Sequence, residues 1–296
     1  MRSSTILRAI LRAPGPNIID AISQEKPHEP INFKKALEQH NNYAKALQTL
    51  GVTPIIKKAH SQFPDGCFTE DTHLILPEVV IVLNPGAVSR SQEPATLRDA
   101  LPTDRPLKYI SNGLTIDGGD ILVANKRIYI GLSTRTKTQA VEQLKEIVSS
   151  YGYTVFPLQV PLGLHLKSGM TCIIDKKYGN PVFIIQKDFE ILIKELRKDN
   201  MHKNEYIEYF VVPETEKFAA NILPLNEGII IPSGCPVTKN FLLKHYSAEK
   251  IIELDTSEFR KVDGALTCLS IPYKIAVEVE NATQPTVEST TMRAKL

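Results

Sequence analysis

The chain has 296 residues, of which 42% are hydrophobic and 23% are charged, and its formal net charge is +2. This composition is typical of a globular protein with a sizeable core. The near balance of charges, without a concentrated basic block, argues against nucleic acid or an anionic membrane as the partner, and no apolar run approaches the length of a transmembrane helix.

The cysteines favour a reducing compartment. The four of them are widely spaced and form no Cys-x-x-Cys pair, so neither a metal site nor a cofactor is predicted. We expect free thiols in the cytoplasm. The N-terminal "MRSSTILRAILRAP" has arginines and serines but no acid, which leaves a mitochondrial presequence as the minor alternative to a first β-strand.

Hydrophobic periodicity and turn residues predict a repeated order of strand, strand, helix and strand. Helices are expected over 33–50, 91–101, 138–150, 187–198 and 237–246. Strands are expected over 5–14, 52–59, 68–76, 79–86, 107–111, 116–123, 127–133, 154–160, 163–174, 181–186, 206–213, 219–225, 228–234, 250–255 and 262–271.

Five such modules account for most of the chain. They start near Asp71, Asp117, His165, Asn221 and Cys268, which are 46 to 56 residues apart. A period in the range of about 20–50 residues indicates a repeat architecture. The last module begins near the C-terminus and takes its helix and final strand from the N-terminal part of the chain.

This sharing between the termini predicts a closed α/β ring with pseudo-fivefold symmetry, because closure removes exposed sheet edges. Equivalent residues of the modules should then meet around the central axis. We expect one domain over 1–273. The polar remainder, 274–296, is expected to be disordered or peripheral.

Cys268 is the first candidate for chemistry. It follows the Asp263-Gly264 turn in an apolar run that is typical of a buried strand, where a small residue is usually core filling. The repeat, however, places His165 and Asp117 beside it. A nearby imidazole can supply acid–base chemistry near neutral pH to a thiol nucleophile.

Acidic residues also gather at the module starts. "PDGCFTEDT" contains Asp65, Glu70 and Asp71, and "IDGGD" contains Asp117 and Asp120. Acids beside glycines often only shape turns, which is the default for Asp120. Several carboxylates in one pocket indicate a cationic ligand, and a guanidinium pairs with carboxylates in a planar, bidentate manner.

Two arginines complete the predicted pocket. Arg90 and Arg135 each follow the second strand of a module, so both are expected at one rim of the ring, where they would suit a carboxylate. Acids at the bottom and arginines at the rim fit a free amino acid with a cationic side chain, such as arginine or a derivative.

Residues 8–273 resemble the dimethylarginine dimethylaminohydrolases. The resemblance rests on segments in the family's order and near its spacing: "FPDGCFTEDT", "NPGAVSR", "IDGGDILV", "IGLSTRT", "GLHLKSG" and "VDGALTC". It implies a five-bladed α/β propeller that hydrolyses free asymmetric dimethylarginine or monomethylarginine, without metal or cofactor. The products are citrulline and dimethylamine or methylamine. The resemblance also implies a monomer or homodimer and relief of nitric oxide synthase inhibition.

The same resemblance implies roles for individual residues. Cys268 corresponds to the nucleophile that forms a covalent thiouronium intermediate, His165 to the general acid and base, and Asp117 to the acid of the "DGGD" motif. The residues implied in substrate binding are Asp71 at the guanidinium, Asp65 and Glu70 as supporting acids, Arg90 and Arg135 at the carboxylate, Ile22 in the lid segment "GPNIIDAISQ", and the backbone of Val262 and Asp263 at the α-amino group.

Other guanidine-modifying enzymes are the alternative. Arginine deiminases and amidinotransferases typically have an acid two residues after the histidine, where this chain has Lys167, and tend to have Arg-Asp in place of Glu70-Asp71. These departures favour an N-methylated substrate. Leu269 stands where some relatives have a second cysteine. A non-catalytic arginine-binding protein is the least favoured reading.

Overall fold

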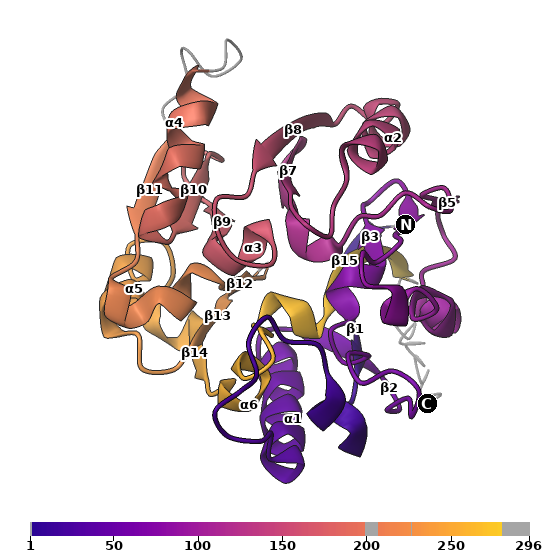
Figure 1. Cartoon of the computed structure of the whole chain (residues 1–296). Coiled ribbons are helices and arrows are strands. Elements are labelled where there is room, and N and C mark those ends of the chain that lie inside the picture. The colour runs from indigo at the N-terminus through magenta and orange to yellow at the C-terminus, as the bar shows by residue number, and fades with distance from the viewer. Residues whose placement is uncertain (1, 199–206, 226, 280–296) are drawn as a thin grey trace, which may run out of the picture.

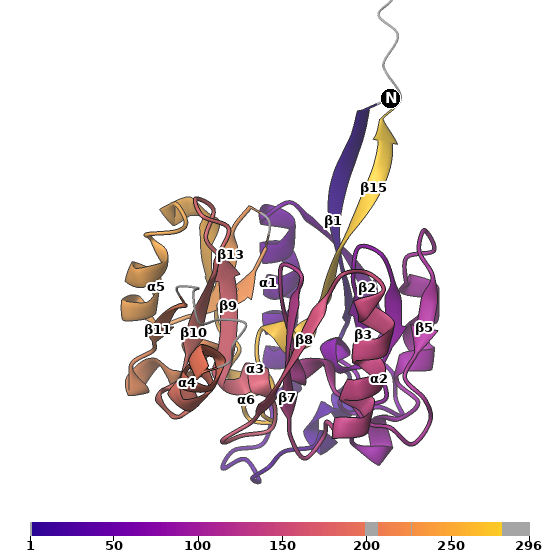
Figure 2. The same ribbon diagram turned by 90° about the horizontal axis from the view of Figure 1, so that it is seen from above.

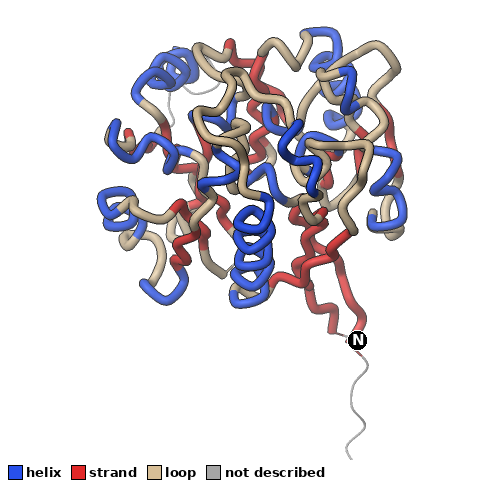
Figure 3. Tube along the Cα trace, turned by 60° about the horizontal axis from the view of Figure 1, so that its bottom comes forward, coloured by secondary structure: helices blue, strands red, loops and turns tan. Residues whose placement is uncertain are grey.

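The computed structural model describes residues 2–198, 207–225 and 227–279. Five three-stranded sheets stand around a common axis, with helices on the periphery (Figures 1 and 3). The predicted five-bladed α/β propeller is therefore confirmed. Within the described residues, no helix is both long enough and apolar enough to cross a membrane.

Each blade follows the same hydrogen-bonding order. The blades are β3 (His73–Ile75), β4 (Val80–Val82) and β5 (Leu107–Tyr109); β6 (Ile121–Ala124), β7 (Arg127–Leu132) and β8 (Thr154–Gln159); β9 (Met170–Ile174), β10 (Pro181–Ile185) and β11 (Glu208–Val211); β12 (Leu223–Pro224), β13 (Ile229–Pro232) and β14 (Ile251–Leu254); and β15 (Ile271–Val279), β1 (Arg2–Arg12) and β2 (Val52–Lys57). The first two strands of every blade are antiparallel and the last two are parallel.

A parallel pair needs a crossover, and helices supply most of them. Four blades use α1 (Phe33–Thr49), α2 (Thr138–Ser149), α4 (Glu190–Lys198) and α5 (Pro236–Leu242). On α2 the buried side chains recur at helical spacing, at Ala140, Val141, Leu144 and Val148, as the sequence predicts. A further single turn, α6 (Ser257–Arg260), precedes the last blade.

The segment 91–101 differs from the α-helix expected there. It contains one 3₁₀ helix, η4 (Pro94–Ala100), and follows another, η3 (Val88–Arg90); in these helices backbone bonds join residues three apart, such as Thr96 N to Glu93 O at 3.0 Å. The spacing of apolar residues in the sequence cannot distinguish a short 3₁₀ helix from a single turn of α-helix.

Regular structure extends into the expected C-terminal tail. Strand β15 continues past Tyr273 to Val279 and pairs with β1 along its whole length, from Ile271 with Ile10 to Val279 with Arg2. The two strands form a ribbon that projects from the body of the molecule (Figure 2). The rest of the expected tail, 280–296, lies outside the described residues.

A short helical turn precedes the first strand of every blade. These turns are η2 (Thr69–Thr72), η5 (Gly118–Asp120), α3 (Leu166–Gly169), η8 (Glu214–Ala220) and η10 (Thr267–Leu269). Successive turns contact one another around the axis, and Asn221 completes the circle through hydrogen bonds to Thr267. The prediction that the module starts meet at the axis is thus confirmed.

Gly118 shows how tightly this circle is packed. A Cβ atom on Gly118 would lie only 2.0 Å from the carbonyl oxygen of Glu70. We expect Gly118→Ala to lower the free energy of unfolding by about 1–3 kcal/mol or more, because backbone must move to relieve the clash. Urea denaturation would measure it.

Gly234→Ala is the matched control. Gly234 has a φ of +79° but no atom within 4 Å of the added Cβ, so its cost is about 1–2 kcal/mol of backbone strain only. A Gly118→Ala protein as stable as the wild type would contradict close packing at the axis.

Candidate active site

Cys268 lies in the turn η10 rather than in a strand, which corrects the expectation from its apolar surroundings. Asp263 adopts a left-handed conformation with a φ of +59°, and the Gly264 N–H returns to the carbonyl of Phe259 at 2.9 Å. Strand β15 begins only at Ile271. The turn therefore holds Cys268 just before the start of β15, where the side chain is partly exposed.

A small cavity of about 30 Å³ brings most of the predicted site residues together. Cys268 and His165 line it together with ten others: Ile22, Asp65, Phe68, Asp71, Arg90, Arg135, Leu164, Val262, Asp263 and Gly264. Among the residues predicted for the site, Glu70 and Asp117 do not line this cavity.

Asp117 stands behind His165. His165 is the residue immediately before α3, and its Nε2 lies 2.9 Å from Asp117 Oδ2. The other carboxylate oxygen accepts the backbone N–H of Gly86 at 2.5 Å, and Asp117 is fully buried. Both oxygens are therefore engaged, and Asp117 is placed to orient the imidazole rather than to contact a ligand.

The site favours a charged imidazole. Burial alone would lower the pKa of His165, but the negative charge of Asp71, the hydrogen bond that the imidazolium donates to Asp117 and the charge of Asp120 outweigh burial and raise the pKa to about 9. His165 is therefore an imidazolium at neutral pH.

The same surroundings keep the thiol neutral. Burial raises the pKa of Cys268, and the negative charges of Glu70 and Asp71 raise it further. The unliganded site consequently pairs a neutral thiol with an imidazolium.

Asp117→Asn is expected to lower the pKa of His165, because it removes one of the groups that stabilise the imidazolium. NMR titration of the imidazole would show this. The raised pKa also stabilises the folded protein fully below the ordinary histidine pKa of about 6.5, and that contribution is lost as the pH rises through about 9. Asp71 and Asp120 are still present in the variant, so it should keep only part of this dependence of unfolding free energy on pH.

Asp175→Asn offers a matched control. Asp175 Oδ2 lies 3.2 Å from His245 Nδ1, so this change also breaks a histidine–aspartate pair, but at a place that lines neither the small cavity nor the site around Cys268. It should leave the titration of His165 unchanged. An Asp117→Asn protein in which His165 still titrates near 9 would contradict the role given to Asp117.

Arg90 is buried in the structure, which corrects its expected place at the rim. Its Nη1 lies 2.6 Å from Asp71 Oδ2, its Nε and Nη2 bind the carboxylate of Glu93, and Nη2 also donates to the Phe68 carbonyl. Only Arg135 keeps partial exposure. Glu93 was missed by the sequence reasoning, although its spacing of three residues from Arg90 is a recognisable ion-pair signal.

Asp71 remains a carboxylate over the working pH range. Burial raises its pKa, but the charges of Arg90 and His165 outweigh burial and bring it down to about 2. Its Oδ1 accepts the backbone N–H of Gly119 at 2.8 Å. An incoming guanidinium must share Asp71 with Arg90 or displace it.

The segment between β1 and α1 closes over the cavity. The Ile22 N–H donates to Asp65 Oδ1 at 3.0 Å, and the Gln24 N–H donates to Asp263 Oδ2 at 2.6 Å. The cavity beneath is too small for an amino acid the size of arginine, since a single water needs about 10–15 Å³. The segment must therefore move for such a ligand to enter.

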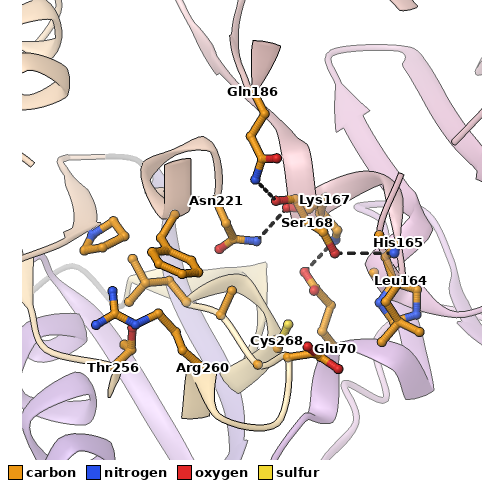
Figure 4. A pocket seen from close by; sticks show the side chains of 18 of the residues that line it. Glu70, Leu164, His165, Lys167, Ser168, Gln186, Asn221, Thr256, Arg260 and Cys268 are labelled. Atoms are coloured by element: carbon orange, nitrogen blue, oxygen red, sulfur yellow. Dashed lines mark hydrogen bonds and ion pairs between the residues drawn. The ribbon is translucent and has the colours of Figure 1, made fainter. Parts of the chain in front are cut away.

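Glu70 belongs to a polar network beside Cys268 (Figure 4). Its carboxylate binds Lys167 Nζ at 2.5 Å and Thr267 Oγ1 at 2.8 Å. Asn221 donates to the Lys167 carbonyl at 2.9 Å and to Thr267 Oγ1 at 3.0 Å, and it accepts the Thr267 N–H. The sequence placed Asn221 at a module start but gave it no role. It joins the turn that carries Cys268 to the helix that follows His165.

Three residues of the site have the composition of a metal-binding set. Ligand atoms of Asp71, Asp117 and His165 lie within 4.8 Å of one another. Their carboxylate oxygens already accept hydrogen bonds from Arg90, Gly119, Gly86 and His165. A metal ion would have to displace these donors, whereas an organic cation can add to them.

Comparisons with known proteins agree with this geometry. Residues 15–269 match the family described as N,N dimethylarginine dimethylhydrolase, eukaryotic. The dimethylarginine dimethylaminohydrolase of Pseudomonas aeruginosa is 31% identical over 89% of this chain and 98% of its own length, and that of Streptomyces coelicolor is 28% identical over 89% and 96%.

A solved structure gives the same result. It is that of a cysteine-to-serine variant of the Pseudomonas aeruginosa enzyme complexed with citrulline, which has a TM-score of 0.79 at 29% identity and is matched over 90% of this chain and 98% of that one. The fold of this chain is thus shared with a solved dimethylarginine dimethylaminohydrolase. The chain belongs to the N,N-dimethylarginine dimethylhydrolase family.

Proposed function

We propose that the protein hydrolyses free Nω-methylated arginine to citrulline and methylamine or dimethylamine. One observation carries the proposal: Cys268 and His165 line a cavity together with Asp71, Asp65 and both arginines. Family membership supports the same reaction. We place the reaction in the cytoplasm, with no cofactor or metal, in a monomer or homodimer.

The amino-acid end of the substrate occupies the small cavity. Arg135 and Arg90 hold its carboxylate, and Asp65 with the backbone at Val262 and Asp263 holds its ammonium group. Asp71 pairs with the guanidinium. In this orientation each charged group of the substrate meets protein groups of opposite charge. The segment around Ile22 must open to admit the ligand and then close over it.

The cationic substrate activates the nucleophile. Because Glu70 and Asp71 raise the pKa of the Cys268 thiol, a guanidinium bound beside them lowers it again and favours the thiolate. The thiolate attacks the guanidinium carbon. The His165 imidazolium gives its proton to the departing nitrogen as the carbon–nitrogen bond breaks, which leaves a covalent thiouronium.

Water then completes the reaction. His165, now neutral, takes a proton from the water that attacks the thiouronium carbon, and the collapse of the adduct releases citrulline and the Cys268 thiolate. Proton transfer by a positioned group contributes roughly 10²–10⁴-fold to rates of this kind. His165 therefore acts in both halves of the cycle.

Lys167 favours methylated arginine over arginine. Its ammonium neutralises Glu70, so the far side of the guanidinium meets no free carboxylate to accept further N–H groups. A methylated guanidinium nitrogen has fewer N–H groups that need a hydrogen-bond acceptor. An arginine deiminase remains the alternative reaction.

Citrulline release from three substrates tests the proposal. The purified protein is offered asymmetric dimethylarginine, monomethylarginine and arginine. We expect release from the first two and little from arginine. Turnover of arginine alone would make the protein a deiminase, and turnover of none would contradict the proposed function.

A further inference from the structure

A second, larger cavity also includes Cys268 in its wall (Figure 4). It measures about 170 Å³ and shares five residues with the small cavity, namely Leu164, His165, Asp263, Gly264 and Cys268. The two cavities therefore meet at the nucleophile and at the imidazole. Arg90, Arg135, Asp65 and Asp71 line only the small one.

The different lining of the two cavities indicates how the substrate is oriented. With the amino-acid end in the small cavity, the reacting carbon lies at the junction. The departing nitrogen must lie close to His165, which protonates it, and its substituents then point into the larger cavity. At about 10–15 Å³ for one water, that cavity has room for a group many times larger than one or two methyls.

The wall of the larger cavity is apolar in part. Its apolar residues include Ala265, Leu266, Phe218 and Pro232. Arg260 and Thr256 also line it, and the guanidinium carbon of Arg260 stands 4.7 Å from the centre of the Phe218 ring. Arg260 forms no ion pair with any residue in the described ranges.

An arginine without a counter-charge in a cavity is suited to an anion. A carboxylate would give Arg260 the planar partner that it lacks, with the Phe218 ring fixing the orientation of the guanidinium. Two further cations line this cavity: Lys167 is paired with Glu70, and the His165 imidazolium is paired with Asp117. The carboxylate of Asp263, which also lines the cavity, accepts the Gln24 N–H. Among the cationic side chains of the cavity, Arg260 is thus the one without a carboxylate partner in the described ranges.

We propose that the larger cavity is a subsite for Nω-substituents that end in a carboxylate, and that Nω-carboxyalkyl arginines are a second substrate class. This inference rests on the proposed function, because it uses the same nucleophile and orientation. Nω-carboxymethylarginine and water would yield citrulline and glycine. The bond between the guanidinium carbon and the substituted nitrogen breaks, His165 protonates that nitrogen, and water supplies the oxygen of citrulline.

The test compares acids with their neutral counterparts. Arginines that carry an Nω-carboxymethyl, 2-carboxyethyl or 3-carboxypropyl group are assayed beside the corresponding carboxamides, with citrulline and the released amino acid measured by mass spectrometry. We expect at least one acid to be hydrolysed with a kcat/KM about tenfold or more above its amide, as one charge-assisted contact provides.

Arg260→Gln should remove this preference and leave monomethylarginine turnover unchanged, while Arg260→Lys should retain part of it. Lys217→Gln is the matched control, since Lys217 Nζ also stands over the Phe218 ring, at 5.9 Å, but Lys217 does not line the cavity. Turnover of monomethylarginine with no acid hydrolysed, or a preference that survives Arg260→Gln, would overturn the inference. Failure of monomethylarginine itself would instead overturn the proposed function.

Discussion

Cys268→Ser is expected to abolish citrulline release from asymmetric dimethylarginine, with kcat lowered by more than about 10⁴-fold. A serine hydroxyl at this position cannot form the thiouronium, and no neighbouring base is poised to ionise it, because His165 is already protonated at neutral pH. Substrate should still bind, since the charged groups of the small cavity are untouched. Steady-state citrulline assays and calorimetric titration would separate the two effects.

Cys235→Ser is the matched control for this loss. Cys235 is also a free thiol, but it is buried in the blade of β13 and its Sγ contacts the carbonyl of Ser233 at 3.8 Å. Its replacement should leave kcat within a small factor of the wild type. A Cys268→Ser protein that keeps measurable turnover would exclude covalent catalysis by this residue.

His165→Asn is expected to lower kcat by about 10²–10⁴-fold and to change its dependence on pH. In the wild type, turnover should fall as the pH rises above about 9, because the acid form of His165 is then lost. The variant lacks this acid, so its residual rate should show no such fall. Rates measured from pH 6 to 10 in both proteins would reveal the difference.

His245→Asn controls for the loss of a buried imidazole, since His245 pairs with Asp175 outside the site. This variant should retain the wild-type dependence of turnover on pH. If His165→Asn kept the fall above pH 9, another group would have to be the acid.

The repeat made the architecture predictable. Five rounds of the same element order, the last divided between the termini, required a closed ring, and the structure shows five sheets with one pairing scheme. The placement of Asp71, His165 and Cys268 around one axis followed from their positions in the modules. Sequence alone could reach this far because each strand and crossover leaves a local pattern.

Features that depend on contacts between distant segments were not predictable. The run around Cys268 is apolar in a turn as well as in a strand, so periodicity could not place it in η10. Arg90 is buried because it binds Asp71 and the Phe68 carbonyl. These partners lie 19 and 22 residues away in the sequence. The larger cavity depends on the contact between Phe218 of η8 and Arg260 of α6, which no sequence motif records.

The ribbon of β1 and β15 has a consequence for how the enzyme becomes active. Because β1 is held between β15 and β2, this strand cannot obtain its full set of partners until β15, much later in the chain, has been synthesised. Cys268, the proposed nucleophile, precedes β15 by only a few residues. The proposed catalytic centre is therefore completed only when the ring closes. A chain whose synthesis has not reached Cys268 would contain the acidic residues and His165 but not the thiol.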